Sequence, residues 1–103
     1  MKKIYLSGPM KGIPEKNHPL FNRVAAELRE QGHAVFNPAE YVYNGDEFPL
    51  RKAFTDYCNF IVNEATAIVM LPGYEKSVGA TSELALAKNF SDIEIIYYGE
   101  AAL

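Results

Sequence analysis

The sequence lacks the residues that build disulfide-bonded or metal-bound scaffolds. It contains one cysteine, Cys58, and two histidines, His18 and His33. A single cysteine excludes an intrachain disulfide, and its place in an apolar-periodic segment favours a buried thiol over a reactive one. Neither histidine has a second ligand at the spacing that metal sites use. We therefore predict no metal ion and no other cofactor.

A basic excess and a long apolar N-terminal run are also missing. The formal net charge is -3, and both signs are spread along the chain. The sequence has no basic stripe of the kind that binds along a phosphate backbone, so we expect no nucleic-acid polymer as partner. A small anionic ligand is compatible with this charge distribution. The apolar run at residues 4–6 is too short for a signal peptide or a membrane span. The composition thus predicts a cytoplasmic protein that does not bind membranes.

The length and the periodicity of apolar residues indicate one domain, residues 1–103, with alternating strands and helices. Short β-prone runs bounded by turn residues are typical of strands that are covered on both faces. Apolar residues at helical spacing fill the segments between them. We predict strands at 3–7, 33–36, 67–71 and 93–98, and helices that begin at Asn17, Pro49 and near Ser77. Asn17 can cap the first helix. One face of the second helix is marked by apolar residues at helical spacing, which are Leu50, Ala53, Phe54, Tyr57 and Ile61.

This order predicts an α/β fold of three layers. A parallel sheet of four to five strands would carry helices on both faces, as in Rossmann-like and flavodoxin-like proteins, because crossovers between parallel strands are right-handed. Ligands bind such sheets beyond the carboxyl ends of the strands. The rule selects three loops, at residues 8–16, 37–48 and 72–77.

The first of these loops, "SGPMKG", contains residues suited to a ligand. Gly8 and Gly12 allow backbone amides to approach a bound molecule, Met10 lies between them, and Lys11 supplies a positive charge. The spacing matches neither a P-loop nor a dinucleotide fingerprint. A tight turn between strand and helix explains the same residues equally well.

The stretch "LPGYEKSVGATSELALA", residues 71–87, is more informative. Ser77 is placed to cap a helix, and Gly79 leaves the first-turn amides open, which suits a phosphate or carboxylate. Glu83 follows too late for a capping box and shares a helical face with Ala80 and Ala87. Small neighbours leave room for a ligand to reach its carboxylate. The alternatives are a simple cap and a solvated glutamate.

Four other residues are weaker candidates. Tyr5 lies in the first strand and Tyr74 in the loop that should adjoin it, but tyrosines are often core residues with a satisfied hydroxyl. Asn37 ends the second strand, where it can bind a ligand or stabilise a turn. Asp56 falls at the edge of the polar side of the second helix, which favours a solvated carboxylate.

Three segments together carry a resemblance to a known family. "IYLSGPMKG", "NPAE" and the 71–87 stretch resemble the nucleoside 2-deoxyribosyltransferase-like superfamily, especially its short phage and bacterial members, over residues 3–98. The resemblance implies cleavage of the N-glycosidic bond of a deoxyribonucleoside or its 5'-monophosphate. A glutamate at the position of Glu83 would attack the anomeric carbon, and the sugar would pass to another base or to water.

The resemblance also implies roles for other residues. Tyr5 matches the tyrosine that orients the nucleophile, and Gly8 the glycine that lets backbone approach the ligand. Ser77 and Gly79 match residues that hold the 5'-phosphate. Lys11 matches a basic position, which favours a nucleotide over a nucleoside. A homo-oligomer, dimer or higher, is expected, in the cytoplasm of the host if a phage encodes the chain.

Two positions depart from the family pattern. Thr66 and Cys58 stand where relatives carry aspartates, and Asp56, the nearest candidate for the catalytic acid, is two residues out of register. Two residues along a helix correspond to a rotation of roughly 200°. A non-catalytic module that binds or sequesters a nucleotide is therefore the alternative function. A different glycosidic substrate, such as a nicotinamide dinucleotide, also stays open.

Overall fold

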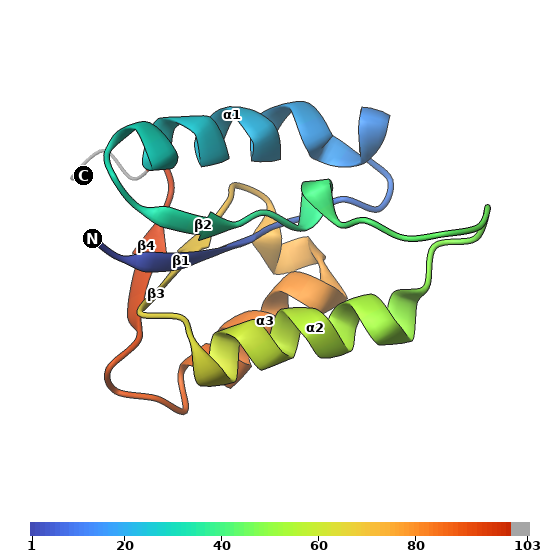
Figure 1. Cartoon of the computed structure of the whole chain (residues 1–103). Coiled ribbons are helices and arrows are strands. Elements are labelled where there is room, and N and C mark those ends of the chain that lie inside the picture. Colours follow the sequence, from blue (N-terminus) through green and yellow to red (C-terminus); the bar gives the residue numbers. More distant parts are fainter. Residues whose placement is uncertain (100–103) are drawn as a thin grey trace.

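The chain folds around one parallel sheet with helices on both faces, as its sequence predicts. The structure is a computed structural model that describes residues 1–99, so the predicted domain extends slightly beyond them. The four strands lie in the order β2-β1-β3-β4, and every pairing is parallel (Figure 1). In chain order the elements are β1 (Lys3–Ser7), α1 (His18–Glu30), β2 (Ala34–Phe36), α2 (Leu50–Asn63), β3 (Ala67–Met70), α3 (Val78–Ala87) and β4 (Glu94–Tyr97). Three short 3-10 helices, η1 (Pro14–Asn17), η2 (Pro38–Glu40) and η3 (Tyr74–Lys76), lie in the loops.

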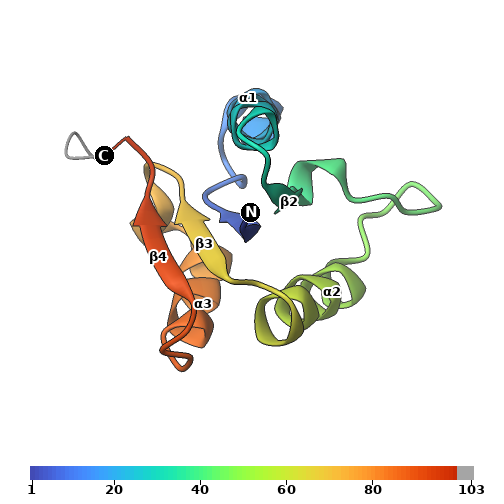
Figure 2. The same ribbon diagram turned by 60° about the vertical axis from the view of Figure 1, so that its left-hand side comes forward.

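The helices divide between the two faces of the sheet. Helix α1 covers one face, and α2 with α3 covers the other (Figures 1 and 2). Side chains alternate along β1 accordingly: Ile4 and Leu6 pack in the layer beneath α1, whereas Tyr5 packs in the layer of α2 and α3. The central strands are buried on both faces, while the edge strands β2 and β4 are only half-buried or exposed. The prediction of two-sided cover thus holds for the central pair alone.

Two local predictions for the helices are wrong. Asn17 makes no side-chain cap for α1, because it adopts a left-handed backbone conformation with φ of 62° and its Nδ2 donates to the Pro9 carbonyl at 3.0 Å instead. The amide thus ties the start of the helix to the loop after β1. Leu50, expected on the buried face of α2, is 67% exposed. It is the first residue of α2, and the buried residues of this helix begin only at Ala53.

The loops after β1 and β3 lie against each other. A Cβ atom on Gly8 would lie 2.7 Å from Cβ of the buried Leu71, which no side chain tolerates without displacement. A Cβ atom on Gly73, whose φ is +86°, would lie 3.3 Å from Cγ of Pro9, a less severe but still tight contact. Glycine at position 8 is therefore explained by close backbone packing, and the two loops form one continuous wall.

Among the described residues, no helix is long and apolar enough to cross a membrane.

Candidate functional site

A large cleft opens at the carboxyl ends of the strands. Its volume is about 1530 Å³, and it is lined from the loops after β1, β2 and β3 and from α2 and α3. The loops selected from the sequence thus surround one space, as expected for a parallel α/β sheet. The predicted site residues that line it are Tyr5, Gly8, Met10, Lys11, Gly12, Ser77, Gly79 and Glu83.

Glu83 lies on the inner face of α3 and lines this cleft. Its side chain is only 6% exposed, and its carboxylate accepts two hydrogen bonds from β1. The Tyr5 hydroxyl donates to Oε2 at 2.9 Å, and the Ser7 hydroxyl donates to Oε1 at 2.6 Å. Each carboxylate oxygen therefore has one fixed donor, so the group is held in a single orientation.

The carboxylate is held in a protein environment that opposes its charge. Burial raises the pKa of Glu83 from 4.5 to about 7, although the hydrogen bonds from Ser7 and Tyr5 act in the opposite direction. Burial and the neighbouring Glu83 together raise the pKa of Tyr5 well above its usual value, so this phenol stays a donor. Near neutral pH, Glu83 can therefore be an ionised nucleophile or a protonated acid.

Ser7 is a site residue that the sequence reading missed. Tyr5 and Ser7 are two positions apart on β1, so strand alternation places both side chains on the face that α3 covers. Tyr5 is among the candidates named from the sequence, but its neighbour on the same face of the strand is not. A search for polar residues at the same parity as Tyr5, near the carboxyl end of the strand, would have found Ser7.

Removing either hydroxyl should raise the pKa of Glu83 further. A hydrogen bond to an ionised group contributes about 1.5–3 kcal/mol, so Ser7→Ala or Tyr5→Phe should move the pKa upward by about one unit or more. Carbon NMR titration of the Glu83 carboxyl measures this shift directly. Ser91→Ala, an exposed serine outside the cleft, is the control. An unchanged pKa in both variants would contradict the geometry described here.

Ser77 caps α3 as predicted. Its hydroxyl oxygen accepts a hydrogen bond from the Ala80 amide at 3.1 Å, and a Cβ atom on Gly79 in the first turn would make only ordinary van der Waals contact, with Oγ of Ser77 at 3.9 Å. Both residues line the cleft. The amides of a first helical turn have no carbonyl partner within the helix, so they can donate to an anion there.

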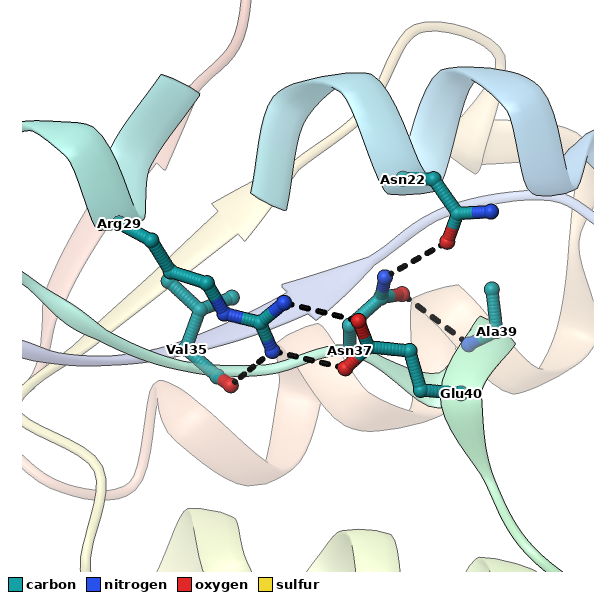
Figure 3. A network of polar contacts seen from close by, with 6 residues as sticks. All are labelled: Asn22, Arg29, Val35, Asn37, Ala39 and Glu40. Atoms are coloured by element: carbon teal, nitrogen blue, oxygen red, sulfur yellow. Dashed lines mark hydrogen bonds and ion pairs between the residues drawn. The ribbon is translucent and has the colours of Figure 1, made fainter. Parts of the chain in front are cut away.

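Asn37, a predicted binding residue, is engaged elsewhere. Its side-chain oxygen accepts from the Ala39 amide at 3.0 Å and its Nδ2 donates to Asn22 at 3.0 Å, which fixes η2 against α1 (Figure 3). Beside it, Arg29 forms an ion pair with Glu40 at 2.7 Å. Among the described residues, Asn37 is not part of the lining of the cleft, and its contacts are those of the turn-stabilising alternative.

Tyr74 and Asp56 are also placed outside the lining of the cleft within residues 1–99. The Tyr74 ring packs against Tyr97, with ring centroids 5.7 Å apart. Asp56 accepts from the Tyr41 hydroxyl and pairs with Lys52 at 3.1 Å, and these partners lower its pKa. The carboxylate lies behind Tyr41, which does line the cleft.

Aromatic residues form much of one wall, and the sequence reading did not select them. They come from α2 and the loop before it, on the face opposite α1. The helical spacing of Phe54 and Tyr57 indicated a shared face, but only the fold shows that this face borders the carboxylate. The aromatic wall consists of Tyr41, Tyr43, Phe48, Phe54 and Tyr57.

Tyr57 stands out in this wall. Its side chain is only 8% exposed, and burial, with the negative charge of Glu83 as the next cause, raises its pKa to about 12. Its ring lies 6.1 Å from that of Tyr5. Its hydroxyl has no hydrogen-bond partner among residues 1–99, yet no side-chain polar atom described there is both fully buried and unpaired. The hydroxyl is therefore accessible, and the residue lines the cleft. It can therefore donate to a bound ligand.

Within residues 1–99, no group of three or more His, Cys, Asp or Glu side chains is arranged to hold a metal ion. His18 lines the cleft, and Nδ1 of His33 accepts from the Lys2 amide at 3.0 Å. Cys58 is half-buried, and burial raises the pKa of its thiol, which keeps it protonated.

Comparison with known protein families identifies one match. The family described as Domain of unknown function (DUF4406) matches residues 2–97, which is nearly the whole chain, and the chain belongs to this family. No curated protein sequence matches it.

Proposed function

We propose that this DUF4406 protein cleaves the N-glycosidic bond of a deoxyribonucleotide, with Glu83 as the nucleophile. One observation carries the proposal: a buried carboxylate, held by two hydroxyls, lines a cleft whose other described charged residues are all basic. A solvated surface glutamate has no such setting. The resemblance to nucleoside 2-deoxyribosyltransferases supports the same reading.

The reaction divides into two steps at Glu83. In the first, a carboxylate oxygen bonds to the anomeric carbon of the sugar while the bond from that carbon to the base nitrogen breaks, and its electron pair leaves with the base. The departing base takes up a proton from solvent, and the water or base that attacks in the second step returns one to solvent. In the second, water or another base attacks the same carbon and releases the carboxylate. Tyr5 and Ser7 are positioning residues, because they hold the attacking group.

The two walls of the cleft suit the two ends of a nucleotide. The start of α3, with Ser77 and Gly79, offers amides to a 5'-phosphate, and Lys11 adds a positive charge from the adjacent loop. The aromatic wall offers faces on which a base can stack. The sugar between them would lie near Glu83. This division supports a nucleotide over a free nucleoside.

Tyr57 is a better candidate than Asp56 for a substrate contact. Replacing Tyr57 with phenylalanine removes only the hydroxyl and should lower kcat/KM roughly three- to tenfold, the value of one hydrogen bond. Asp56→Asn should stay within about twofold, because its carboxylate is paired with Lys52 and Tyr41. Steady-state kinetics of both variants, with kcat and KM separated, makes the comparison. An Asp56→Asn variant as inactive as a Glu83 variant would reverse the assignment.

A non-catalytic nucleotide-binding module is the second candidate. It is favoured by the absence of any acid other than Glu83 from the lining of the cleft within the described residues. A reaction that needs a strong second acid would then not proceed. Such a module would be stabilised by its ligand according to RT ln(1 + [L]/Kd), without turnover.

The proposal is tested by offering the purified protein a panel of deoxynucleosides and their 5'-monophosphates and measuring base release by chromatography. Release that depends on Glu83 supports the glycosidase. If no member of the panel releases its base but a ligand raises the Tm, the glycosidase proposal is replaced by the nucleotide-binding module.

We also propose that the protein forms a homo-oligomer. It is supported by apolar side chains that line the cleft yet face solvent: Leu50 is 67% and Val78 83% exposed. Contact with a second copy would cover them. Sedimentation at several concentrations measures the subunit number, and a monomer throughout would contradict the prediction.

A further inference from the structure

The distribution of charge in the cleft is opposite to that of the chain. Within residues 1–99, four of the ten lysine and arginine residues line it, but only one of the twelve acidic residues, Glu83. The net charge of the chain is nevertheless -3. The four cations are Lys11, Lys16, Arg51 and Lys76. A cleft of one sign on a protein of the other concentrates ligands of opposite charge.

These cations are not neutralised by the protein. Of the six other lysine and arginine residues, three form ion pairs within residues 1–99: Lys2 with Glu94, Arg29 with Glu40 and Lys52 with Asp56. Within residues 1–99, by contrast, none of the four side chains around the cleft forms an ion pair or a hydrogen bond. All four are exposed to solvent and therefore free to contact an anion.

The cations fall into an inner and an outer pair. Lys11 and Lys76 come from the loops after β1 and β3, which pack against each other through Pro9 and Gly73, and Lys76 directly precedes the Ser77 cap. Lys16 and Arg51 come from η1, just before α1, and from the first turn of α2. Figure 1 shows that α1 and α2 begin at the same end of the sheet, on its opposite faces. The outer pair is therefore contributed from segments that lead into or begin helices on opposite faces of the sheet.

We infer that the cleft binds a nucleotide carrying a pyrophosphate group, that is, a nucleoside diphosphate or triphosphate, with its first phosphate at the inner pair and the following ones at the outer pair. The inference rests on the proposed function for the nucleoside part. A monophosphate carries two negative charges at most and would leave the outer pair without a partner. The volume of about 1530 Å³ also exceeds the roughly 300–1000 Å³ of a usual small-molecule site.

Binding measurements that do not depend on turnover test the inference. We would titrate Glu83→Gln protein calorimetrically with a deoxynucleoside 5'-monophosphate, diphosphate and triphosphate, and with inorganic phosphate and pyrophosphate. The diphosphate should bind about tenfold more tightly than the monophosphate, since charge-assisted hydrogen bonds to one more phosphate contribute on the order of 1.4 kcal/mol. The advantage should shrink as salt is raised. Equal affinities for all three nucleotides would overturn the inference.

Variants assign the effect to the outer pair. In Lys16→Ala with Arg51→Ala, the advantage of the diphosphate should disappear while monophosphate affinity changes less than about twofold. Lys88→Ala, an exposed lysine at the end of α3 outside the cleft, should leave both affinities unchanged. Loss of monophosphate and diphosphate binding in equal measure would contradict the division into two pairs.

One further ligand, a dinucleotide, distinguishes the two kinds of molecule that carry a pyrophosphate group. A dinucleotide joined by pyrophosphate should bind less tightly than the triphosphate, and the reverse order would replace the nucleoside polyphosphate by a dinucleotide. The same experiments distinguish failure of the proposed function from failure of this inference. If no nucleotide releases its base but the diphosphate still binds more tightly than the monophosphate, only the proposed glycosidase activity is wrong. If monophosphates alone bind and react, only the inference of a pyrophosphate site is wrong.

Discussion

Replacing Glu83 with glutamine is expected to lower base release at least 10³-fold, the largest effect of any single substitution in this chain. Loss of a nucleophile removes the covalent step itself, and a factor of 10³ corresponds to about 4 kcal/mol of activation free energy. Glutamine keeps the size of the side chain and can still pair with Tyr5 and Ser7. Chromatography of released base, with wild type and variant at equal concentration, measures the ratio.

The matched control is Glu75→Gln, an exposed glutamate in η3 that does not line the cleft. It should keep wild-type activity. Intact-mass analysis after an acid quench gives a second readout, because wild type and the control, but not Glu83→Gln, should gain the mass of a deoxyribosyl phosphate. Full activity of Glu83→Gln would remove this residue from the mechanism and with it the observation that carries the proposed function.

The pH dependence of the wild type should follow from the same carboxylate. Attack on the sugar requires the ionised form, so kcat/KM should fall about tenfold per unit as pH drops below the pKa of about 7. A flat profile between pH 5 and 8 would show that ionisation of Glu83 does not limit the reaction.

The same substitution should make the protein more stable at pH 8. The pKa of Glu83 is raised by burial from 4.5 to about 7 in the folded state, so the folded protein holds a proton that the unfolded chain has lost between these values. The free energy of unfolding of the wild type therefore falls as pH rises from about 4.5 to 7 and then levels. The shift corresponds to about 3 kcal/mol. Glu83→Gln has no proton to lose and escapes this decrease.

Urea unfolding of wild type and Glu83→Gln at pH 5 and pH 8 measures the effect. The difference between the two proteins cancels the titration of every other group, so it isolates Glu83. From pH 5 to pH 8, we expect the free energy of unfolding of Glu83→Gln to rise relative to that of the wild type by up to about 3 kcal/mol. A constant difference would mean that the carboxylate is better solvated than its 6% exposure indicates. A gain in stability coupled to a loss of activity is typical of active-site residues.

The layers of the fold followed from local patterns. The strands found at Lys3–Ser7 and Ala67–Met70 match the predicted runs within one residue, because β-branched and apolar runs bounded by Gly, Pro and loop residues leave few other states. The caps were less predictable. Ser77 caps α3 as expected, whereas Asn17 adopts a left-handed conformation that its contact with Pro9 supports. A cap depends on backbone angles that distant contacts can change.

The sequence alone determined the order of strands and helices, the loops that surround the cleft, and Glu83 as the residue to examine. These depend on periodicity and on turn residues, which act over a few positions along the chain. Only the tertiary structure decided which side chains meet Glu83. Ser7 joins it from 76 residues away in the chain, Tyr57 opens to the same space, and Asp56 turns to Lys52 instead. Burial of the carboxylate, and hence its raised pKa, exists only once the helices have packed on the sheet, because desolvation is a property of the whole fold.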